Sequence, residues 1–356
     1  MQLTTLGWTD RLAAAFEPYA ARNLAPARIA VEHRSRYVLY AEDGEHDAVL
    51  AGRLRQENDL AAWHPVVGDW VAVALGTGDG PAVIHAVLPR ATRFARRAPL
   101  RDDIEQVLAA NIDRVLIVVA ADRDTNARRI ERYLAMAWEG GAEPVIVLSK
   151  CDLDGADDRR RDIEAAALGI RVISVSNITG DGVEDVRALL MEGTTTALLG
   201  SSGVGKSSLV NSLLGGGREQ LRTGAVRDDG KGRHTTTHRE LVPLSSGGLL
   251  LDTPGMRELG LWDASEGTRE VFADIAALSD RCRFTDCGHD TEPGCAVLDA
   301  VATGEVSQER LDSWRKLVAE LAYLERRDDA RARSERSRQD AAASRRLRDR
   351  LRDKYS

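Results

Sequence analysis

A glycine-rich segment, residues 200–207, has the residue types and the spacing of a loop that binds phosphate. It reads G-S-S-G-V-G-K-S and fits the pattern G-x-x-x-x-G-K-[ST], in which backbone N–H groups surround the phosphates of a nucleotide. A short apolar strand is expected before it and an apolar-periodic helix after it, which is the context that the pattern requires. The predicted nucleotide contacts are Gly200, Ser201, Ser202, Gly203, Val204, Gly205, Lys206, Ser207 and Ser208.

Catalysis and Mg²⁺ binding require side chains around this loop. Lys206 is expected to bridge the β- and γ-phosphates as the catalytic cation, and the Ser207 hydroxyl is expected to hold Mg²⁺. The sequence D-T-P-G follows an apolar strand expected at 249–251. Asp252 is therefore predicted to reach the same Mg²⁺, and the Gly255 N–H to contact the γ-phosphate.

A polar segment, residues 230–237, lies between these two motifs and reads G-K-G-R-H-T-T-T. It has almost no apolar residue to bury, so it is expected to be mobile without ligand and ordered around a nucleotide. Thr235 and Thr236 are predicted to complete the Mg²⁺ shell. Met256 stands where ordinary GTPases have a water-orienting glutamine. His234 is the nearest candidate for that task, and the alternative is an ordinary loop histidine.

Two further loops carry residues suited to reading a guanine base. Ser149, Lys150 and Asp152 fit the element N/T-K-x-D with a serine in first place, and a strand-end Asp can accept hydrogen bonds from the ring N–H and the amino group of guanine. Ser176 and Asn177 resemble the S-A-K loop that supports the base. The chain has only five lysines, and two of them fall where the base-reading and phosphate motifs require one. The motifs favour GTP over ATP and disfavour an ATPase or a kinase.

The order of these motifs is unusual, because both base-reading loops precede the phosphate loop, whereas in ordinary GTPases they follow it. The predicted strands are 115–120, 144–148, 172–175, 196–199 and 249–251, and the predicted helices are 127–138, 157–168 and 183–191. Alternation of this kind is typical of a mostly parallel α/β sheet. The sequence therefore predicts a circularly permuted P-loop α/β GTPase core, which is tolerated when the original termini lie close together.

Three cysteines and a histidine cluster late in the chain in the pattern C-x4-C-x-H-x5-C, formed by Cys282, Cys287, His289 and Cys295. Three thiolates and one imidazole are a complete tetrahedral ligand set for Zn²⁺, which indicates a structural ion rather than a catalytic one. We therefore predict one structural zinc per chain. The chain has only four cysteines, and their clustering favours a metal site in a reducing, cytoplasmic compartment over a disulfide scaffold.

Ahead of the core, the pattern changes to short strands. An amphipathic helix is expected within residues 1–25, followed by strands at 29–31, 37–40, 48–54, 70–73 and 83–87. Five short strands suit a small closed barrel, for which an OB-fold is favoured and an SH3-like barrel is the alternative.

The segment that follows the barrel, residues 90–101, holds five arginines and one aromatic residue. It is either a solvated linker or a strip that contacts RNA. In the second case Arg93, Arg96 and Arg97 would meet phosphates and Phe94 would stack on a base.

The net charge of −7 is unevenly distributed along the 356 residues. Residues 326–356 contain twelve basic and six acidic residues, so a basic tail follows an acidic body, which points to a nucleic-acid partner. An amphipathic helix is expected at 308–324, and the tail beyond it, with few apolar residues, is expected to be disordered. No apolar run approaches membrane length and no signal-peptide pattern opens the chain, so no membrane partner is expected.

Together, these motifs resemble those of the RsgA (YjeQ) family of circularly permuted GTPases that depend on the small ribosomal subunit. The likeness rests on the motif order, on G-R-H-T-T-T, D-T-P-G and C-x4-C-x-H-x5-C, and on V-G-D-W-V at 67–71 and A-N-I-D at 110–113. It covers about residues 30–325. The resemblance implies an OB-fold, a GTPase core and a zinc-bearing C-terminal domain, with activity stimulated by the small subunit late in its assembly.

We therefore expect a multidomain protein with an N-terminal helix and OB-fold RNA-binding domain (1–95), a circularly permuted GTPase domain (96–265), a zinc-binding α-helical domain (266–325) and a basic tail (326–356). The expected function is hydrolysis of GTP to GDP and phosphate by a monomer that binds the small ribosomal subunit and its rRNA as a checkpoint. The alternative is an rRNA-binding module whose nucleotide site is mainly structural.

Overall fold

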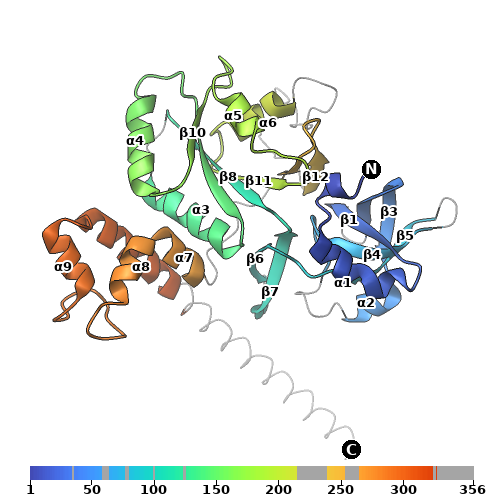
Figure 1. Ribbon diagram of the computed structural model, residues 1–356, viewed down its shortest axis with the longest axis horizontal. Helices are drawn as coiled ribbons and strands as arrows, with labels where there is room; N and C mark the ends of the chain where they lie inside the picture. Colours follow the sequence, from blue (N-terminus) through green and yellow to red (C-terminus); the bar gives the residue numbers. More distant parts are fainter. Residues whose placement is uncertain are drawn as a thin grey trace, which may run out of the picture.

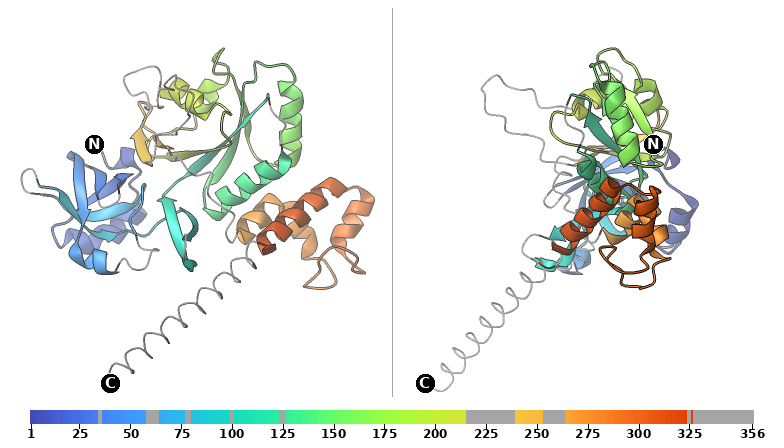
Figure 2. Two further views of the ribbon diagram at one scale, coloured as in Figure 1. Left: turned by 180° about the vertical axis from the view of Figure 1, so that it is seen from behind. Right: turned by 90° about the vertical axis from the view of Figure 1, so that its left-hand side faces the viewer.

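The computed structural model describes residues 1–33, 36–57, 64–76, 80–98, 101–122, 126–214, 239–252, 264–323 and 326. A β-barrel, an α/β sheet and a group of helices follow one another along the chain (Figure 1). The barrel and the helices lie at opposite ends of the long axis, with the α/β part between them, as the reverse view also shows (Figure 2). None of the helices in the described ranges combines the length and apolar character needed to cross a bilayer.

The barrel is built from β1 (Ala25–Glu32), β2 (Tyr37–Ala41), β3 (Gly44–Leu50), β4 (Trp70–Ala74) and β5 (Ala82–Val87). The strands pair in the order β1-β2-β3-β5-β4, and β4 pairs again with β1, which closes the barrel. β3 and β5 are parallel, whereas the other neighbours are antiparallel. This closed five-stranded barrel is the OB-fold predicted from the sequence, and its parallel pair does not fit the SH3-like alternative.

The barrel interior is filled by alternate residues of its strands, with no exposed surface at Ile29, Leu39, Val71 and Ile84. Helix α1 (Asp10–Ala20) packs on the barrel, and the indole of Trp8 just before it lies 4.7 Å from that of Trp70 between ring centroids. The prediction of a strand over 48–54 is wrong in its second half, because β3 ends at Leu50 and helix α2 (Gly52–Glu57) follows. The α2 sequence, G-R-L-R-Q-E, is rich in good helix formers.

The α/β part contains the parallel strands β8 (Arg114–Ala120), β9 (Glu143–Ser149), β10 (Val172–Val175), β11 (Thr195–Leu199) and β13 (Leu249–Asp252). An antiparallel strand that the sequence analysis missed, β12 (Glu240–Pro243), pairs with β13. The helices of this part are α3 (Ala127–Glu139), α4 (Ala156–Ala166), α5 (Val183–Arg187) and α6 (Lys206–Leu214). Helix α5 is shorter than predicted, because the chain turns after Arg187 and directs Leu189 and Leu190 into the core.

The strand order confirms the circular permutation. In space the strands run β10-β9-β8-β11-β13-β12, so β11, which leads into the phosphate loop, lies between a strand that precedes it in the chain and one that follows it. Moving β8, β9 and β10 behind β13 in the sequence would give the strand order of an ordinary GTPase without changing the sheet. The fold therefore preserves the spatial arrangement of the core and changes only where the chain enters and leaves it.

The arginine-rich segment supplies the first strand of a hairpin between the barrel and the sheet. Strand β6 (Arg93–Ala98) pairs with β7 (Arg101–Ala110) in a separate two-stranded sheet. Phe94 is only 3% exposed, and a Cβ at Gly140, just after α3, would lie 2.6 Å from its ring. The alternative in which Phe94 stacks on a base is therefore wrong for this residue, because its ring packs against the end of α3.

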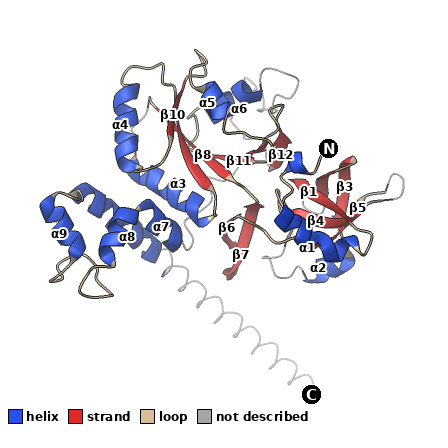
Figure 3. Ribbon diagram, viewed as in Figure 1, coloured by secondary structure: helices blue, strands red, loops and turns tan. Residues whose placement is uncertain are grey.

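The last described part is helical, with α7 (Ser265–Val271), α8 (Ala273–Ser279), α9 (Ala296–Thr303) and a further helix over 308–323 close to the predicted 308–324 (Figure 3). Phe272, Val297 and Leu311 have no exposed surface and form its centre. It is the α-helical domain that the sequence predicts around the cysteine cluster.

A buried arginine of the barrel joins three segments. Arg28 is 1% exposed, and its guanidinium donates to the carbonyl oxygens of Leu6, Gly68 and Asn111 at 2.5, 3.2 and 2.9 Å. Burial lowers the pKa of Arg28 to about 10, although the negative charges of Asp113 and Asp69 act to raise it. Arg28 therefore stays protonated at neutral pH. Since residue 111 directly precedes the α/β sheet, Arg28 connects the N-terminal segment, the barrel and the entrance of the core.

Replacing this guanidinium should destabilise the protein. Arg28→Met keeps an apolar stem but leaves three carbonyl groups, two of them in buried hydrogen bonds, without their charged donor. We therefore expect the free energy of unfolding to fall by about 3 kcal/mol. Chemical denaturation measures this change. Arg11→Met, at an exposed position of α1, should stay within about 0.5 kcal/mol of the parent. Equal losses for the two variants would contradict the role given to Arg28.

Candidate nucleotide-binding site and metal centre

The phosphate loop joins β11 to α6, and its backbone requires glycine. The φ angle is +144° at Gly200 and +94° at Gly205, and a Cβ at Gly200 would lie 2.4 Å from the Val118 carbonyl oxygen on β8. Lys206 Nζ donates to the carbonyl oxygens of Gly200 and Ser201 at 2.7 and 2.8 Å, so the ammonium group lies across the loop. Ser202, Gly203, Ser207 and Ser208 are exposed, and Val204 is buried. The loop thus has the conformation and the cation of an anion-binding site.

Ser149 ties the first of the predicted base-reading loops to the predicted phosphate loop. It ends β9 with no exposed surface, and its hydroxyl lies 2.5 Å from the Val204 carbonyl oxygen and 3.2 Å from that of Val119. The Ser149 hydroxyl therefore lies between β8 and the phosphate loop and reaches a carbonyl oxygen on each. The hydroxyl connects the two loops directly, which is a structural task that a serine can perform in this position.

The predicted guanine-reading carboxylate is oriented by the second loop. Ser176, which has no exposed surface, donates from its hydroxyl to Asp152 Oδ1 at 2.5 Å. The same hydroxyl oxygen accepts the backbone N–H groups of Ile178 and Thr179, both at 3.2 Å. This turn fixes the serine, and the serine in turn fixes the carboxylate of Asp152.

Lys150 and Asn177 complete the two loops. Lys150 has a left-handed backbone with φ +60°, and its Nζ forms an ion pair of 2.5 Å with Asp122, just beyond β8. Asn177 Oδ1 accepts the Ser212 hydroxyl of α6 at 3.2 Å. Its Nδ2 would lie 3.8 Å from a Cβ at Gly205, so the second loop also borders the phosphate loop.

All of these residues lie at one edge of the sheet. The loops follow β9, β10 and β11, which are parallel, so their carboxyl ends meet at the same edge. In open α/β sheets this is where ligands bind. The structure therefore brings the predicted base-reading residues and the phosphate loop together, although they lie far apart in the sequence.

Several predicted site residues are only partly described or not described. Strand β13 ends at Asp252 beside β11, so the backbone of this residue reaches the same edge, but its side chain is not described. Gly255, His234, Thr235 and Thr236 lie outside the described residues. Of the predicted Mg²⁺ ligands, the structure describes the side chain of Ser207, exposed in the first turn of α6.

One residue that the sequence analysis did not single out also reaches the phosphate loop. Arg129 Nη1, from the first turn of α3, donates to the Ser201 hydroxyl at 3.1 Å. In the sequence, the feature that could have identified Arg129 is Asn126. This residue caps α3 and so places residue 129 in the first turn of the helix. Which loop this turn faces follows only from the order of the strands.

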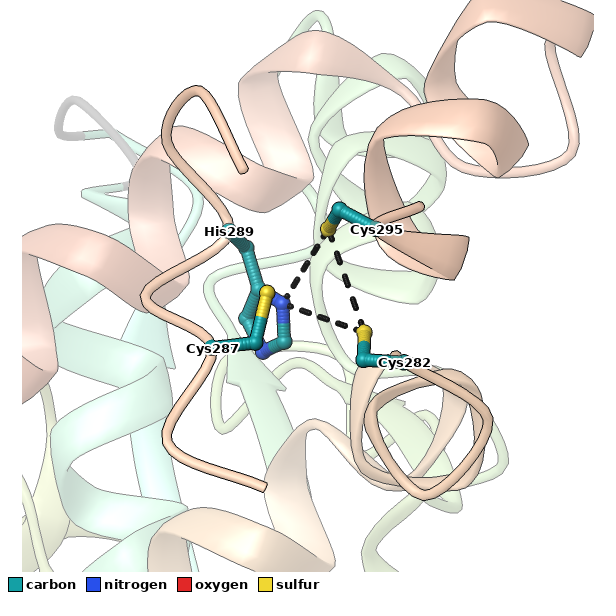
Figure 4. A group of neighbouring side chains, drawn as sticks. All are labelled: Cys282, Cys287, His289 and Cys295. Carbon is teal, nitrogen blue, oxygen red and sulfur yellow. Dashed lines mark hydrogen bonds between the residues drawn. The ribbon is translucent and has the colours of Figure 1, made fainter. Parts of the chain in front are cut away.

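The predicted metal ligands form a compact cluster. The ligand atoms of Cys282, Cys287, His289 and Cys295 all lie within 4.8 Å of one another (Figure 4). His289 Nδ1 lies 3.6 Å from the Cys282 sulfur and 3.3 Å from the Cys295 sulfur, and these two sulfurs are 3.9 Å apart. Tetrahedral Zn–S bonds of about 2.3 Å would place two sulfurs about 3.8 Å apart. The cluster could therefore hold a metal ion.

The surroundings of the cluster orient its histidine and its loop. The Ser279 hydroxyl lies 2.9 Å from His289 Nε2, which leaves Nδ1 facing the sulfurs. Burial lowers the pKa of His289 and so favours the neutral imidazole that a metal requires. Glu292 accepts the backbone N–H groups of Gly288, Asp290 and Thr291, and these bonds lower its pKa to about 2. The carboxylate holds the ligand loop in shape.

Comparison with known proteins agrees with this architecture. The profile of the RsgA GTPase family matches residues 87–262. The chain is 48% identical to the small ribosomal subunit biogenesis GTPase RsgA of Opitutus terrae, with 95% of each chain covered, and 44% identical to that of Streptomyces coelicolor, with 94% and 90% covered. The crystal structure of YjeQ from Thermotoga maritima superposes with a TM-score of 0.65 and 28% identity, covering 84% of this chain and 99% of that one.

The sheet order and the loops at its edge define a circularly permuted GTPase flanked by an OB-fold barrel and a helical domain with a candidate metal centre. Given the extent and identity of the matches, the chain belongs to the RsgA GTPase family.

Asp152→Asn should weaken the binding of GTP and GDP. The amide keeps an oxygen for Ser176 but loses the charge that would accept two guanine hydrogen bonds, each worth roughly 1.5–3 kcal/mol. Affinity should fall at least about tenfold, while xanthine nucleotides gain relative to guanine nucleotides. Titration with fluorescent nucleotides measures both effects, and Asp154→Asn makes the same change of charge at an exposed position of the loop. Unchanged GTP affinity in Asp152→Asn would show that another group reads the base.

Proposed function

We propose that this chain hydrolyses GTP to GDP and phosphate on the small ribosomal subunit, as a checkpoint late in the assembly of that subunit. The observation that carries the proposal is the meeting of the phosphate loop and two base-reading loops at one sheet edge. The names of the Opitutus and Streptomyces relatives, which refer to small ribosomal subunit biogenesis, support the choice of partner.

In this proposal the residues of the site have distinct tasks. Backbone N–H groups of residues 200–208 bind the phosphates, and Lys206 leaves its carbonyl partners to bridge the β- and γ-phosphates. Lys150 and Asp152 hold the base. The ligands of Mg²⁺ would be Ser207, Asp252, Thr235 and Thr236, and the bound ion would neutralise part of the phosphate charge.

The attacking water needs a group to orient it. Met256 stands at the position of the usual glutamine and has no suitable donor or acceptor, so intrinsic turnover should be slow. We assign this task to His234, which adjoins the predicted Mg²⁺-binding threonines in sequence. Contact with the subunit would order residues 230–237 around the nucleotide.

The partner surfaces follow from charge and fold. OB-fold barrels bind oligonucleotides, and Arg93 is exposed on the neighbouring strand β6. We propose that Arg93, together with Arg96 and Arg97, contacts rRNA, and that the basic tail adds to this attraction. The protein would act as a monomer in the cytoplasm, where its partner is assembled.

For the metal centre we propose one structural Zn²⁺ per chain. Three thiolates and an imidazole form a closed set that suits zinc and leaves no position for a substrate. The ion would join the end of α8, the ligand loop and the start of α9, and so stabilise the helical domain.

Removal of a zinc ligand tests this assignment. Metal analysis of the untagged protein should find one zinc per chain, and Cys287→Ala should lose most of it and lower the thermal unfolding temperature, because the ion cross-links the domain. Cys151→Ala, which changes the cysteine outside the cluster, should keep its zinc. A parent protein without zinc, or a Cys287→Ala variant that retains it, would overturn the assignment.

GTP turnover with and without small subunits tests the function itself. Purified protein should hydrolyse GTP slowly, and small subunits but not large ones should accelerate it. His234→Ala should bind GTP normally yet lose stimulated turnover by about a hundredfold, the usual scale for a positioned acid–base group. His238→Ala, four residues further on, is the matched control. Subunit binding without any acceleration would instead support the rRNA-binding module with a structural nucleotide site.

A further inference from the structure

Helix α3 touches two parts of the molecule that the proposed function leaves unconnected. Its first turn faces the phosphate loop, and the rest of the helix lies against the helical domain (Figure 1). The helix has 13 residues, which corresponds to a length of about 20 Å. Among the described residues, this helix provides a direct connection between the helical domain and the nucleotide site.

The contact with the helical domain is close. A Cβ at Gly267 of α7 would lie 2.0 Å from the Ala135 carbonyl oxygen of α3, so the two helix backbones touch. Glu139 Oε2 accepts the Gly267 backbone N–H at 3.0 Å. In addition, Glu131, which is 3% exposed, lies 3.8 Å from the guanidinium of Arg310 in the helix over 308–323. Helix α3 therefore cannot shift without moving the helical domain.

At the other end, one side chain of α3 holds the phosphate loop. Asn126 caps the helix by accepting the Arg129 backbone N–H at 3.3 Å, and Arg129 Nη1 donates to the Ser201 hydroxyl at 3.1 Å. The next residue, Ile130, is 2% exposed and anchors this turn in the core. Ser201 is also one of the two residues whose carbonyl oxygens accept Lys206 Nζ in this structure. Arg129 thus fixes a residue that directly contacts the catalytic lysine.

We propose that Arg129 is a positioning residue for GTP hydrolysis, which holds the phosphate loop through Ser201 and is itself held in place by the seating of α3 on the helical domain. The inference rests on the proposed GTPase activity. It assigns no contact between Arg129 and the nucleotide. Arg129 bonds to the Ser201 side chain, so its loss leaves the backbone N–H groups of the loop and the base-reading loops available to bind the nucleotide. The effect should therefore fall on the step in which Lys206 stabilises the transferred phosphate more than on binding.

The first test compares variants of the full chain in steady-state GTP hydrolysis. Arg129→Ala should lower kcat about tenfold, as expected for one hydrogen bond to a charged group, while KM changes less than about threefold. Arg129→Lys can still donate to the Ser201 hydroxyl and should recover most of the loss. Arg128→Ala removes the same charge from the neighbouring exposed position and should behave like the parent.

Double variants show whether Arg129 acts through its neighbours. Ser201→Ala should reproduce the loss of Arg129→Ala, and the pair should be no slower than either single variant. Glu139→Ala, about 15 Å further along α3, should lower kcat a few-fold alone and have no effect in the Arg129→Ala background. Thermal unfolding of each variant confirms that it is folded.

The possible outcomes are distinct. The proposal is supported if the loss of kcat in Arg129→Ala does not increase when Ser201→Ala or Glu139→Ala is added. A kcat of Arg129→Ala equal to that of the parent, losses that multiply, or no recovery by lysine would overturn it while leaving the GTPase activity intact. Absence of hydrolysis by the parent, with and without small subunits, would overturn the proposed function and this inference with it.

Discussion

The hydrogen bond from Ser149 to the Val204 carbonyl sets the distance between the loop that would read the base and the loop that would bind the phosphates. One nucleotide must span both loops, so this distance cannot vary. The bond is buried, which removes competition from water and makes an unpaired carbonyl costly. The parallel strands beneath it, β9 and β11, are separated only by β8, so the sheet itself brings the two loops within reach of one hydroxyl.

The same constraint explains why the chain can be permuted. The loops depend on the order of strands in space, and the sheet retains that order although β8, β9 and β10 come first in the sequence. The new ends of the core then serve as attachment points. The barrel is joined to the core at residue 111, whose carbonyl oxygen accepts a hydrogen bond from Arg28. Two residues further on, the Asp113 carboxylate accepts the Thr195 N–H at the start of β11. The added domains are therefore connected to the strand that carries the phosphate loop.

The helical domain contacts the core through a largely buried arginine, Arg310, on the helix over 308–323. Arg310 donates to the Ala166 carbonyl oxygen of α4 at 3.2 Å and lies 3.8 Å from Glu131 of α3. Within the helical domain the same guanidinium donates to Val271 and Asp274 and lies 4.3 Å from the Phe272 ring centroid. Because this one side chain has directional partners on both sides, its contacts favour one orientation of the helical domain on the core. A fixed orientation is what allows α3 to link the domain to the nucleotide site.

The sequence by itself determined the chemistry of each motif and the class of each part. Glycine spacing around Lys206, the order of the loops and the C-x4-C-x-H-x5-C pattern are local properties, and alternating strands and helices predict a parallel sheet because buried strands need apolar runs. Only the tertiary structure decided which motifs meet. The bond of Ser149 to Val204, the burial of Phe94 and the contact of Arg129 with Ser201 each join residues more than 40 positions apart. Such contacts depend on strand order and helix packing, which no local pattern encodes.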